Sequence, residues 1–570
     1  LLTSSDFLTG AFPAEYGNAL SAVFDLEMRH GNNERREYIA QAGVNGFEFG
    51  AEGPFTKGKR SSYLVNYRYS TISLLNKLGF EIIDAKLDFQ DLSFNLHFPV
   101  KKGSIGIFGI AGMSGAYENA EKDTSAWDYP SDQAEFFTGS RMAVSGITLN
   151  RILNSTTWLK AVFSTSLSNP FYTEDSIGYD LELYRNIRSD NKEIKSTVSL
   201  LLNKKFSSRL YARAGIIYNH IYTDNNAWQV SWFPERNKHC FSDFSGNTHL
   251  FRVFIQGKYR FSKAVTLNAG LHSMFLALNE DFSLEPRAGL KWDINALNSL
   301  SIAYGMHSQM QPTAVYFSEV YDAAGNMTYP NESLKFTRSH HFILAYDRLL
   351  NENLRLKTEC YYQFLQHVPV GTVNPSASLV NFGSGDEIFN GEIYSNAGRG
   401  RNYGVELTFE RFFNNGYYYL LTGSFFDARY RDGKNIWRNS RYNLHYAYNV
   451  LAGKEFRLWD KHTFGINMTM TGIGGQWFTP VDFEASQAAR QTIRTDSLAY
   501  TEQIKDFRRL DIKIRFRLNH RKFSQEIALD IGNITDRKNI WRQYYDPDTN
   551  SLKYAYLLGR IPVFLYKVEF

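Results

Sequence analysis

Few residues of this chain have the types and spacing that chemistry on a substrate requires. His340 and His341 are adjacent, and neighbouring strand residues point to opposite faces, so they form a poor metal-binding pair. Residues 546–550 look superficially like a calcium loop, but their Pro and Asn fit an ordinary turn better. Cys240 and Cys360 have neither metal-ligand spacing nor a disulfide framework. No nucleophile or acid–base set stands out, so we predict a protein that is not an enzyme and that uses no metal or cofactor.

Composition excludes further classes of function. The 570 residues carry 63 Lys and Arg against 58 Asp and Glu, a net charge of +5, and both signs are interleaved along the chain. This pattern gives no support for nucleic-acid binding. No apolar run approaches the roughly 18 residues that a membrane-spanning helix needs. The 36 Tyr and 44 Phe are many for a globular chain and fit the aromatic girdles of a membrane barrel.

The elements that must position any site are strands. Within residues 508–533, Ile512, Ile514 and Phe516 alternate with Lys513 and Arg515, so one face is apolar and the other charged. The pattern returns after a turn at 519–522 and recurs along the whole chain. Lipid outside and water inside require this repetition in a membrane barrel. We therefore predict an all-β fold, a transmembrane antiparallel β-barrel, with Ile514 facing lipid and Lys513 facing the lumen.

Short turns and long polar loops alternate and set the strand count. Short turns are predicted near 54–60, 99–103, 153–156, 204–208, 261–264, 294–298, 350–353, 413–416, 458–462 and 519–522. Between them lie connections near 44–46, 70–86, 115–139, 168–193, 221–249, 272–285, 306–337, 365–402, 427–441, 472–508 and 533–556, all long except the first. This alternation predicts about 22 strands, an even number typical of bacterial outer-membrane barrels.

The two ends of the chain differ from the middle. Residues 1–33 are rich in small residues and loop-like around one short strand, so we assign them to the end of a separate element and residues 34–570 to the barrel. Leu1 does not begin a signal peptide, so we expect that any secretion signal has been removed or was not included. Tyr566 and Phe570 share one face of the last strand, and we expect this strand to be paired into the sheet.

Three stretches resemble the TonB-dependent outer-membrane receptors, in particular the branch with a carboxypeptidase-like regulatory domain. Residues 12–26, Phe-Pro-Ala-Glu-Tyr-Gly-Asn-Ala-Leu-Ser followed by Val-Phe-Asp-Leu, look like the end of the family's plug. Residues 52–70 look like its first barrel hairpins, and residues 559–570 look like its closing strand. The energy-coupling box and most of the plug have no counterpart here.

The resemblance implies transport across the bacterial outer membrane. In this family a ligand binds the extracellular loops and the plug, and an inner-membrane energy-coupling complex pulls on the plug. Partners would be outer-membrane lipid, that complex, the barrel-assembly machinery and, in some members, a surface lipoprotein. Tyr566 and Phe570 would form the C-terminal assembly signal. The barrel is shorter than those of large glycan importers, which favours a siderophore, a cofactor or a peptide as ligand.

Four residues are predicted at the contact between plug and barrel, and four in ligand-binding loops. Glu15, Tyr16 and Gly17 would meet the barrel wall, Glu15 pairing with a lumenal arginine; the alternative is a structural turn held by Gly17. Glu406 is similar to a barrel Glu that pairs with plug arginines, or is a solvated lumenal carboxylate. The loop candidates, which would bind ligand or pack loops together, are Trp228, Trp232, Phe233 and His239.

The sequence leaves two other functions open. If the lumen is unplugged, the barrel is a passive outer-membrane pore that selects by size. If nothing crosses, it is an adhesin or surface scaffold whose loops bind a partner. Channel conductance separates these two, and uptake that stops when the proton gradient collapses identifies the energised receptor.

Overall fold

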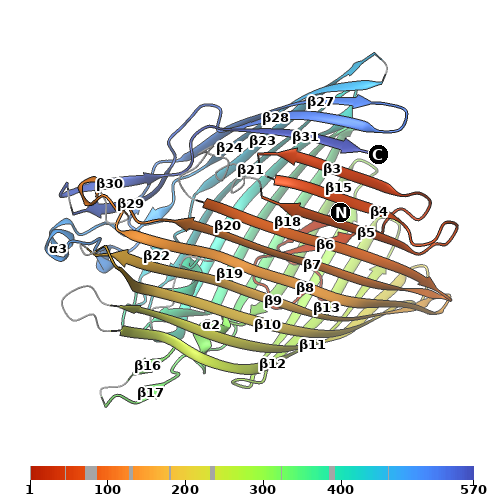
Figure 1. The fold of residues 1–570 in the computed structure, drawn as a ribbon. Helices are drawn as coiled ribbons and strands as arrows, with labels where there is room; N and C mark the ends of the chain where they lie inside the picture. The colour runs from red at the N-terminus through yellow and green to blue at the C-terminus, as the bar shows by residue number, and fades with distance from the viewer. Residues whose placement is uncertain are drawn as a thin grey trace.

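Most of the chain forms one closed barrel (Figure 1). The structure, a computed structural model, describes residues 2–44, 46–70, 86–127, 132–178, 181–230, 238–321, 324–383, 392–459, 461–547 and 549–570. Within these residues, strands dominate and 22 of them close an antiparallel barrel, which confirms the predicted fold class. No helix in these ranges is long and apolar enough to cross a membrane.

Each barrel strand pairs with the next along the chain, and β31 pairs with both β28 and β3 to close the barrel. The barrel strands are β3 (Glu37–Gly43), β4 (Gly46–Pro54), β5 (Ser62–Tyr69), β6 (Lys86–Val100), β7 (Gly103–Glu118), β8 (Ala134–Asn154), β9 (Thr157–Ile177), β10 (Leu183–Lys205), β11 (Leu210–Val230), β12 (Lys238–Arg260), β13 (Val265–Leu276), β14 (Asp281–Asp293), β15 (Asn298–Gln309), β18 (Thr337–Asn351), β19 (Leu354–Gly371), β20 (Tyr394–Asn414), β21 (Tyr417–Arg431), β23 (Tyr446–Leu458), β24 (His462–Ile473), β27 (Phe507–Asn519), β28 (Ser524–Gly532) and β31 (Ile561–Glu569).

Smaller elements lie in the lumen and in the long loops. They are the antiparallel pair β1 (Leu2–Thr9) and β2 (Ala22–Met28), the pairs β16 (Val320–Tyr321) with β17 (Met327–Thr328), β25 (Trp477–Phe478) with β26 (Glu502–Gln503) and β29 (Ile540–Asp546) with β30 (Ser551–Tyr556), the edge strand β22 (Trp437–Asn439), and the helices η1 (Thr124–Ala126), α2 (Thr313–Tyr316), η2 (Leu379–Asn381), α3 (Phe483–Ala489) and η3 (Asp496–Leu498).

The short turns all lie at one end of the barrel and the long loops at the other (Figure 1). Every predicted short turn joins two barrel strands at its predicted place. The turn between β20 and β21 shows why: Asn415 and Gly416 have φ of 54° and 75°, the left-handed conformation that tight hairpins need.

Three predicted loops are wrong in extent, and one of them, 272–285, is reduced to residues 277–280 between β13 and β14. Residues 168–193 and 221–249 are largely strand, because β9 to β12 run 21 to 23 residues each. About 9–11 residues suffice to cross a bilayer, so these hairpins continue well beyond it. Outside the lipid, a pair of hydrogen-bonded strands needs no apolar outer face. The alternation of apolar and polar residues is therefore lost there, although the strands stay paired.

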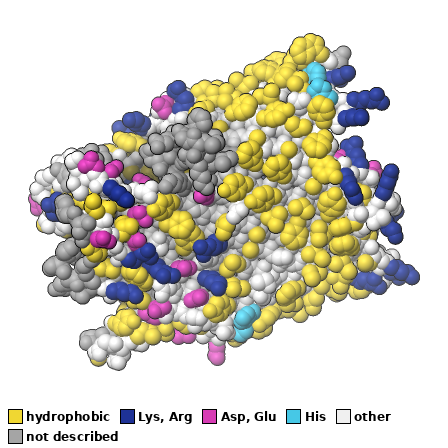
Figure 2. All heavy atoms as spheres, in the orientation of Figure 1, with side chains coloured by type: hydrophobic (Ala, Val, Ile, Leu, Met, Phe, Trp, Pro, Cys, Tyr) yellow, Lys and Arg dark blue, Asp and Glu magenta, His cyan; other side chains and the backbone are white. Residues whose placement is uncertain are grey.

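The outer wall carries a broad band of hydrophobic side chains, flanked by charged ones at both ends (Figure 2). On β27, Ile514 is an exposed residue of this face and pairs across the sheet with Leu529 and Ile466. Lys513 points the other way, into the lumen. Cys360 lies on the outer face between Leu344 and Val405.

Candidate functional site: a segment bound to the inner wall

Residues 10–21, which we call the docked segment, connect β1 to β2 inside the barrel. The chain enters the lumen with these strands, and the N-terminus lies within the outline of the wall in Figure 1. The docked segment contacts inward-facing side chains of six neighbouring strands, β11 to β15 and β18.

Arg287 on β14 is the centre of this site. Its Nη1 donates to three carbonyl oxygens of the docked segment, at 2.7 Å to Pro13, 2.6 Å to Tyr16 and 3.3 Å to Phe12. Its Nη2 donates to Glu285 Oε2 at 2.7 Å, and both side chains are almost fully buried, 4% and 0% exposed. Ser283 donates to the other Glu285 oxygen at 2.8 Å. A buried ion pair is tolerated only with such complete bonding, so the docked segment is part of what satisfies Arg287.

Glu15 and Tyr16 make the polar contacts on either side of the docked segment. The Glu15 carboxylate forms an ion pair with Arg213 on β11 and accepts a hydrogen bond from Gln256 Nε2 at 3.2 Å. The Tyr16 hydroxyl donates to Asp25 Oδ2 at 2.5 Å, so the side chain is bonded to β2, while the Tyr16 carbonyl is bonded to the wall through Arg287. Burial, the bond to Asp25 and the nearby Glu15 charge raise the pKa of Tyr16, which therefore stays protonated.

Gly17 lies where the backbone of the docked segment closely approaches the wall. A Cβ atom built on Gly17 would stand 2.0 Å from Nε2 of His272 on β13. Its carbonyl oxygen accepts from Arg252 Nη1 at 3.3 Å. The wall makes matching room, because a Cβ on Gly270 would meet Ala14 at 2.7 Å and one on Gly305 would meet Ala11 at 3.0 Å. Gly17 thus lies at a point of the docked segment where a side chain would not fit against the wall.

Three buried histidines line the same site. His272 Nδ1 donates to the Ala14 carbonyl at 2.7 Å, and the His307 ring lies 3.9 Å from that of Phe12. His341 lies 4.7 Å from His307, ring centre to ring centre, and bonds Ser339 at 2.8 Å. They do not form a metal site, since no group of three or more metal-ligating side chains with suitable geometry occurs among the described residues.

The sequence reasoning missed Glu285, Arg287 and the histidines as parts of one site. A signal was present: Ser283, Glu285 and Arg287 occupy alternate positions of one strand, a charge pattern unlike the plain polar lumen face. What could not be predicted is that the docked segment covers them, because more than 250 residues separate Tyr16 from Arg287.

A second set of contacts holds the far end of the N-terminal region. Arg29 forms a two-pronged ion pair with Glu52 on β4, at 2.6 and 2.5 Å. Asn32 N donates to the same carboxylate at 2.8 Å, and Asn95 on β6 donates to the Arg29 carbonyl at 3.0 Å. Residues 10–32 are therefore bonded to well-separated parts of the wall, β4 to β6 as well as β11 to β15.

Glu406 lies elsewhere on the wall. It is an exposed residue of β20, directly opposite Glu359 of β19, and in the part of the chain that the structure describes it forms no ion pair or hydrogen bond. Lys357 pairs with Glu359 at 2.9 Å instead. The structure therefore does not bring Glu406 to the docked segment, and its pairing with plug arginines stays a prediction.

The four loop candidates fall in one hairpin. Trp228 lies near the end of β11, half-buried, with Lys238 Nζ 4.7 Å from its ring centre. The backbone of His239 pairs with Gln229. Trp232 and Phe233 lie outside the described residues. Of the four, Trp228 alone can be placed by its side-chain contacts, and its role in ligand binding stays a prediction.

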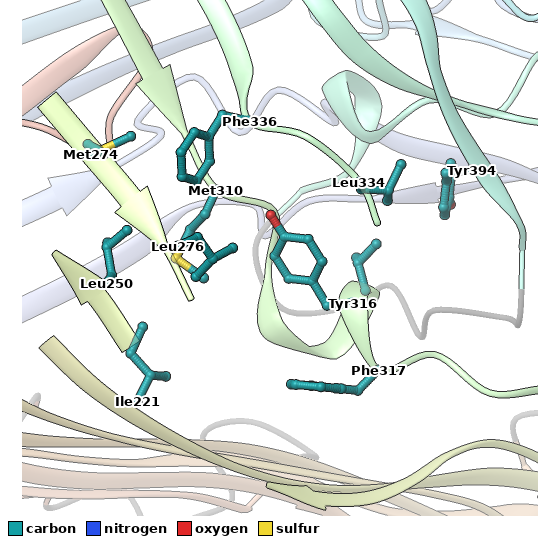
Figure 3. Close-up of a cluster of buried hydrophobic side chains, with 11 residues drawn as sticks. Ile221, Leu250, Met274, Leu276, Met310, Tyr316, Phe317, Leu334, Phe336 and Tyr394 are labelled. Atoms are coloured by element: carbon teal, nitrogen blue, oxygen red, sulfur yellow. The ribbon is translucent and has the colours of Figure 1, made fainter. Parts of the chain in front are cut away.

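A larger aromatic feature of the loop end is the inward loop, residues 310–336 between β15 and β18 (Figure 3). Its Val315, Tyr316 and Phe336 are 0% exposed. They pack on lumenal side chains of β11 to β13, namely Ile221, Leu250, Met274 and Leu276. This loop folds into the barrel and narrows it. The sequence marked 306–337 only as a long connection.

The last strand seals the sheet. β31 pairs Tyr566 with Ile527 of β28 and with Ala42 of β3. Phe570 exchanges backbone hydrogen bonds with Tyr38, at 2.7 and 3.0 Å, and the two rings stack 5.6 Å apart. Both Tyr566 and Phe570 are exposed on the outer face. The expected pairing of this strand is confirmed, and the role of these two residues as an assembly signal stays a prediction.

A closed barrel of this size with a chain segment bound inside can be compared with known proteins. Residues 84–534 match the family model described as TonB dependent receptor-like, beta-barrel. The chain belongs to this family of TonB-dependent receptors. Members are receptors and transporters of the bacterial outer membrane, which act with outer-membrane lipid and the inner-membrane TonB complex. No curated protein matches the sequence of this receptor.

Solved structures share the fold of this receptor. The ferric preacinetobactin receptor BauA of Acinetobacter baumannii has a TM-score of 0.68 at 12% identity, covering 99% of this chain and 85% of its own. The ferric-catecholate import receptor Fiu of E. coli K12 has 0.69 at 12%, covering 98% and 85%. The iron transporter FrpB of Neisseria meningitidis has 0.67 at 13%, covering 100% and 88%. At such identities the likeness concerns the fold alone.

Proposed function

We propose that this receptor takes up, with energy from the inner membrane, a ligand too large or too scarce for porins. The observation that carries the proposal is the docked segment. A wide barrel that served as an open pore would need no buried Arg287 bonded to three carbonyls of a lumenal segment. A barrel that opens under force needs a segment that is held firmly and specifically, by many separable hydrogen bonds.

In this proposal residues 1–33 are the end of a plug domain, and the chain belongs to the branch with a regulatory domain. The long loops, the inward loop among them, and Trp228 lie at the end of the barrel that faces the outside of the cell, and they meet the ligand first. The TonB complex pulls on the part of the plug that precedes the docked segment. A surface lipoprotein and the barrel-assembly machinery are further proposed partners. The relatives BauA and Fiu, which are named for ferric siderophores, make that the first ligand class to test.

The test is uptake by cells that carry or lack the receptor gene. Ferric siderophores, ring cofactors and peptides are supplied one at a time, each as the only source of the nutrient that it carries. We expect one class to require the gene, and its uptake to stop when a protonophore collapses the proton gradient. Receptor-dependent uptake that continues without the gradient would contradict the proposal and favour a passive pore.

Conductance of the full chain in planar bilayers supplies the second arm. We expect a low conductance, since the docked segment and the inward loop narrow the lumen. A large steady conductance would support the passive pore. Low conductance together with no gene-dependent uptake of any class would favour an adhesin or scaffold.

A further inference from the structure

A cavity of about 340 Å³ lies where the docked segment, the inward loop and the barrel wall meet. Gly17 and Asn18 form one side, and residues 310–313 of the inward loop form another. Asn18 Oδ1 accepts from Met310 N at 2.9 Å, so these two sides are joined. The cavity would hold about eleven waters at their liquid volume of about 30 Å³ each. The wall contributes Glu193, Lys195, Asn219, Ile221, Leu250 and Arg252.

Positive charge exceeds negative charge in this cavity. Arg252 donates to two neutral acceptors, the Gly17 carbonyl at 3.3 Å and Asn219 Oδ1 at 3.0 Å. Its Nε is buried and finds no hydrogen-bond partner among the described residues. Neither Arg252 nor Lys195 forms an ion pair within the described ranges. The lining has one carboxylate, Glu193, which accepts from the Thr313 hydroxyl at 3.0 Å.

The nearest other carboxylate, that of Glu285, does not balance the positive charge of the cavity. Glu285 acts on Arg252 through space only and is itself bonded to Arg287. An enclosed cation without a paired anion costs free energy, and an anionic group placed beside it recovers that cost. A planar carboxylate fits a guanidinium especially well.

The lining also contains apolar side chains. Ile221, Leu250 and Met310 are 3%, 2% and 9% exposed and belong to the cluster shown in Figure 3. Ile221 lies directly across the sheet from Lys195, and Leu250 is two residues from Arg252 on the same face of β12, so a molecule that fills the cavity meets cations and aliphatic side chains side by side. We propose that this cavity binds a small aliphatic carboxylate, its carboxylate on Arg252 and Lys195 and its chain against Ile221, Leu250 and Met310.

Such a ligand would touch the docked segment directly. Arg252 would bond both the ligand carboxylate and the Gly17 carbonyl. Occupancy of the cavity and the position of the docked segment are therefore linked through the Arg252 guanidinium. This inference stands apart from energy-coupled uptake, because binding to the purified receptor needs no energy source.

The experiment is titration calorimetry of the purified full-chain receptor with hexanoate, and with hexanamide as its neutral isostere. We expect saturable hexanoate binding, and hexanamide weaker by at least about tenfold, since it lacks the charge-assisted bond. Lys195→Met and Arg252→Met should each weaken hexanoate by about tenfold. Lys513→Met, which removes a lumenal cation outside the cavity, should leave binding unchanged.

Three results would overturn the proposal. Equal binding of hexanoate and hexanamide would show that charge is not recognised. Unchanged binding to Lys195→Met and Arg252→Met would place the ligand elsewhere. Absence of saturable binding to the folded receptor would show that the cavity has another occupant, such as a carboxylate of the polypeptide itself.

Discussion

At the scale of single residues, Arg287 and Glu285 depend on each other. Arg287→Met leaves a buried, unpaired Glu285 and frees three carbonyls of the docked segment. Breaking one partner of a buried pair costs about 3–5 kcal/mol. We expect the free energy of unfolding, measured by urea titration in lipid vesicles, to fall by about that amount. The double variant Glu285→Leu/Arg287→Met should regain a large part of the loss, because no buried charge is left. A double variant less stable than the single one would contradict this account.

Gly17 provides a second test at this scale. In Gly17→Ala, the new methyl group would stand 2.0 Å from the His272 ring, so the ring or the docked segment must move. We expect faster hydrogen exchange of the backbone amides of residues 10–21, measured by mass spectrometry. Gly423→Ala is the matched control, because a Cβ there meets no atom within 4 Å. Equal exchange in both variants would show that Gly17 is not needed for close approach.

At the scale of one strand, β27 tests which face meets lipid. A charged residue on the lipid face near the bilayer midplane costs about 2–4 kcal/mol. We therefore expect Ile514→Arg to reduce the free energy of folding into lipid vesicles by about this amount. Lys513→Glu, its neighbour on the lumenal face, should have much less effect. Equal losses would show that the two faces are assigned wrongly.

The inward loop is the second element to test. Phe336 is fully buried in its cluster, and truncation of a buried Phe costs about 3–5 kcal/mol. We expect Phe336→Ala to loosen residues 310–336, seen as faster hydrogen exchange there and unchanged exchange in β27. Met327→Ala, an exposed position of the same loop, is the control. If both variants exchange alike, the cluster does not hold the loop in place.

At the scale of the whole molecule, closure of the barrel depends on one strand, β31. β31 must bond to β28 and to β3 at once, and Leu565 pairs with Ala528 on one side and Gly43 on the other. Proline at position 565 would remove a backbone donor from a residue that has a partner strand on each side. We expect Leu565→Pro to prevent closure, so that the heat-modifiable folded band on SDS gels is lost. Lys57→Pro, in the short turn between β4 and β5, should retain that band. Normal folding of Leu565→Pro would contradict closure through β31.

The sequence by itself determined the barrel, its turns and the faces of its strands. Alternation such as Ile514 against Lys513 is a local pattern, and lipid outside with water inside permits one arrangement of it. Turn residues such as Asn415 and Gly416 are local as well, so the strand count followed from reading along the chain. Family resemblance also predicted that residues 15–17 meet the wall.

Only the tertiary structure decided what those residues meet. The contacts of Tyr16 with Arg287, of Gly17 with His272 and of Met310 with Asn18 join positions hundreds of residues apart, and no local pattern encodes which lumenal side chain meets which carbonyl. The inward loop escaped prediction for the same reason, because Val315 and Phe336 become buried only once β11 to β13 stand beside them. Alternation fixes the direction in which a side chain points, whereas closure of the barrel fixes its neighbours.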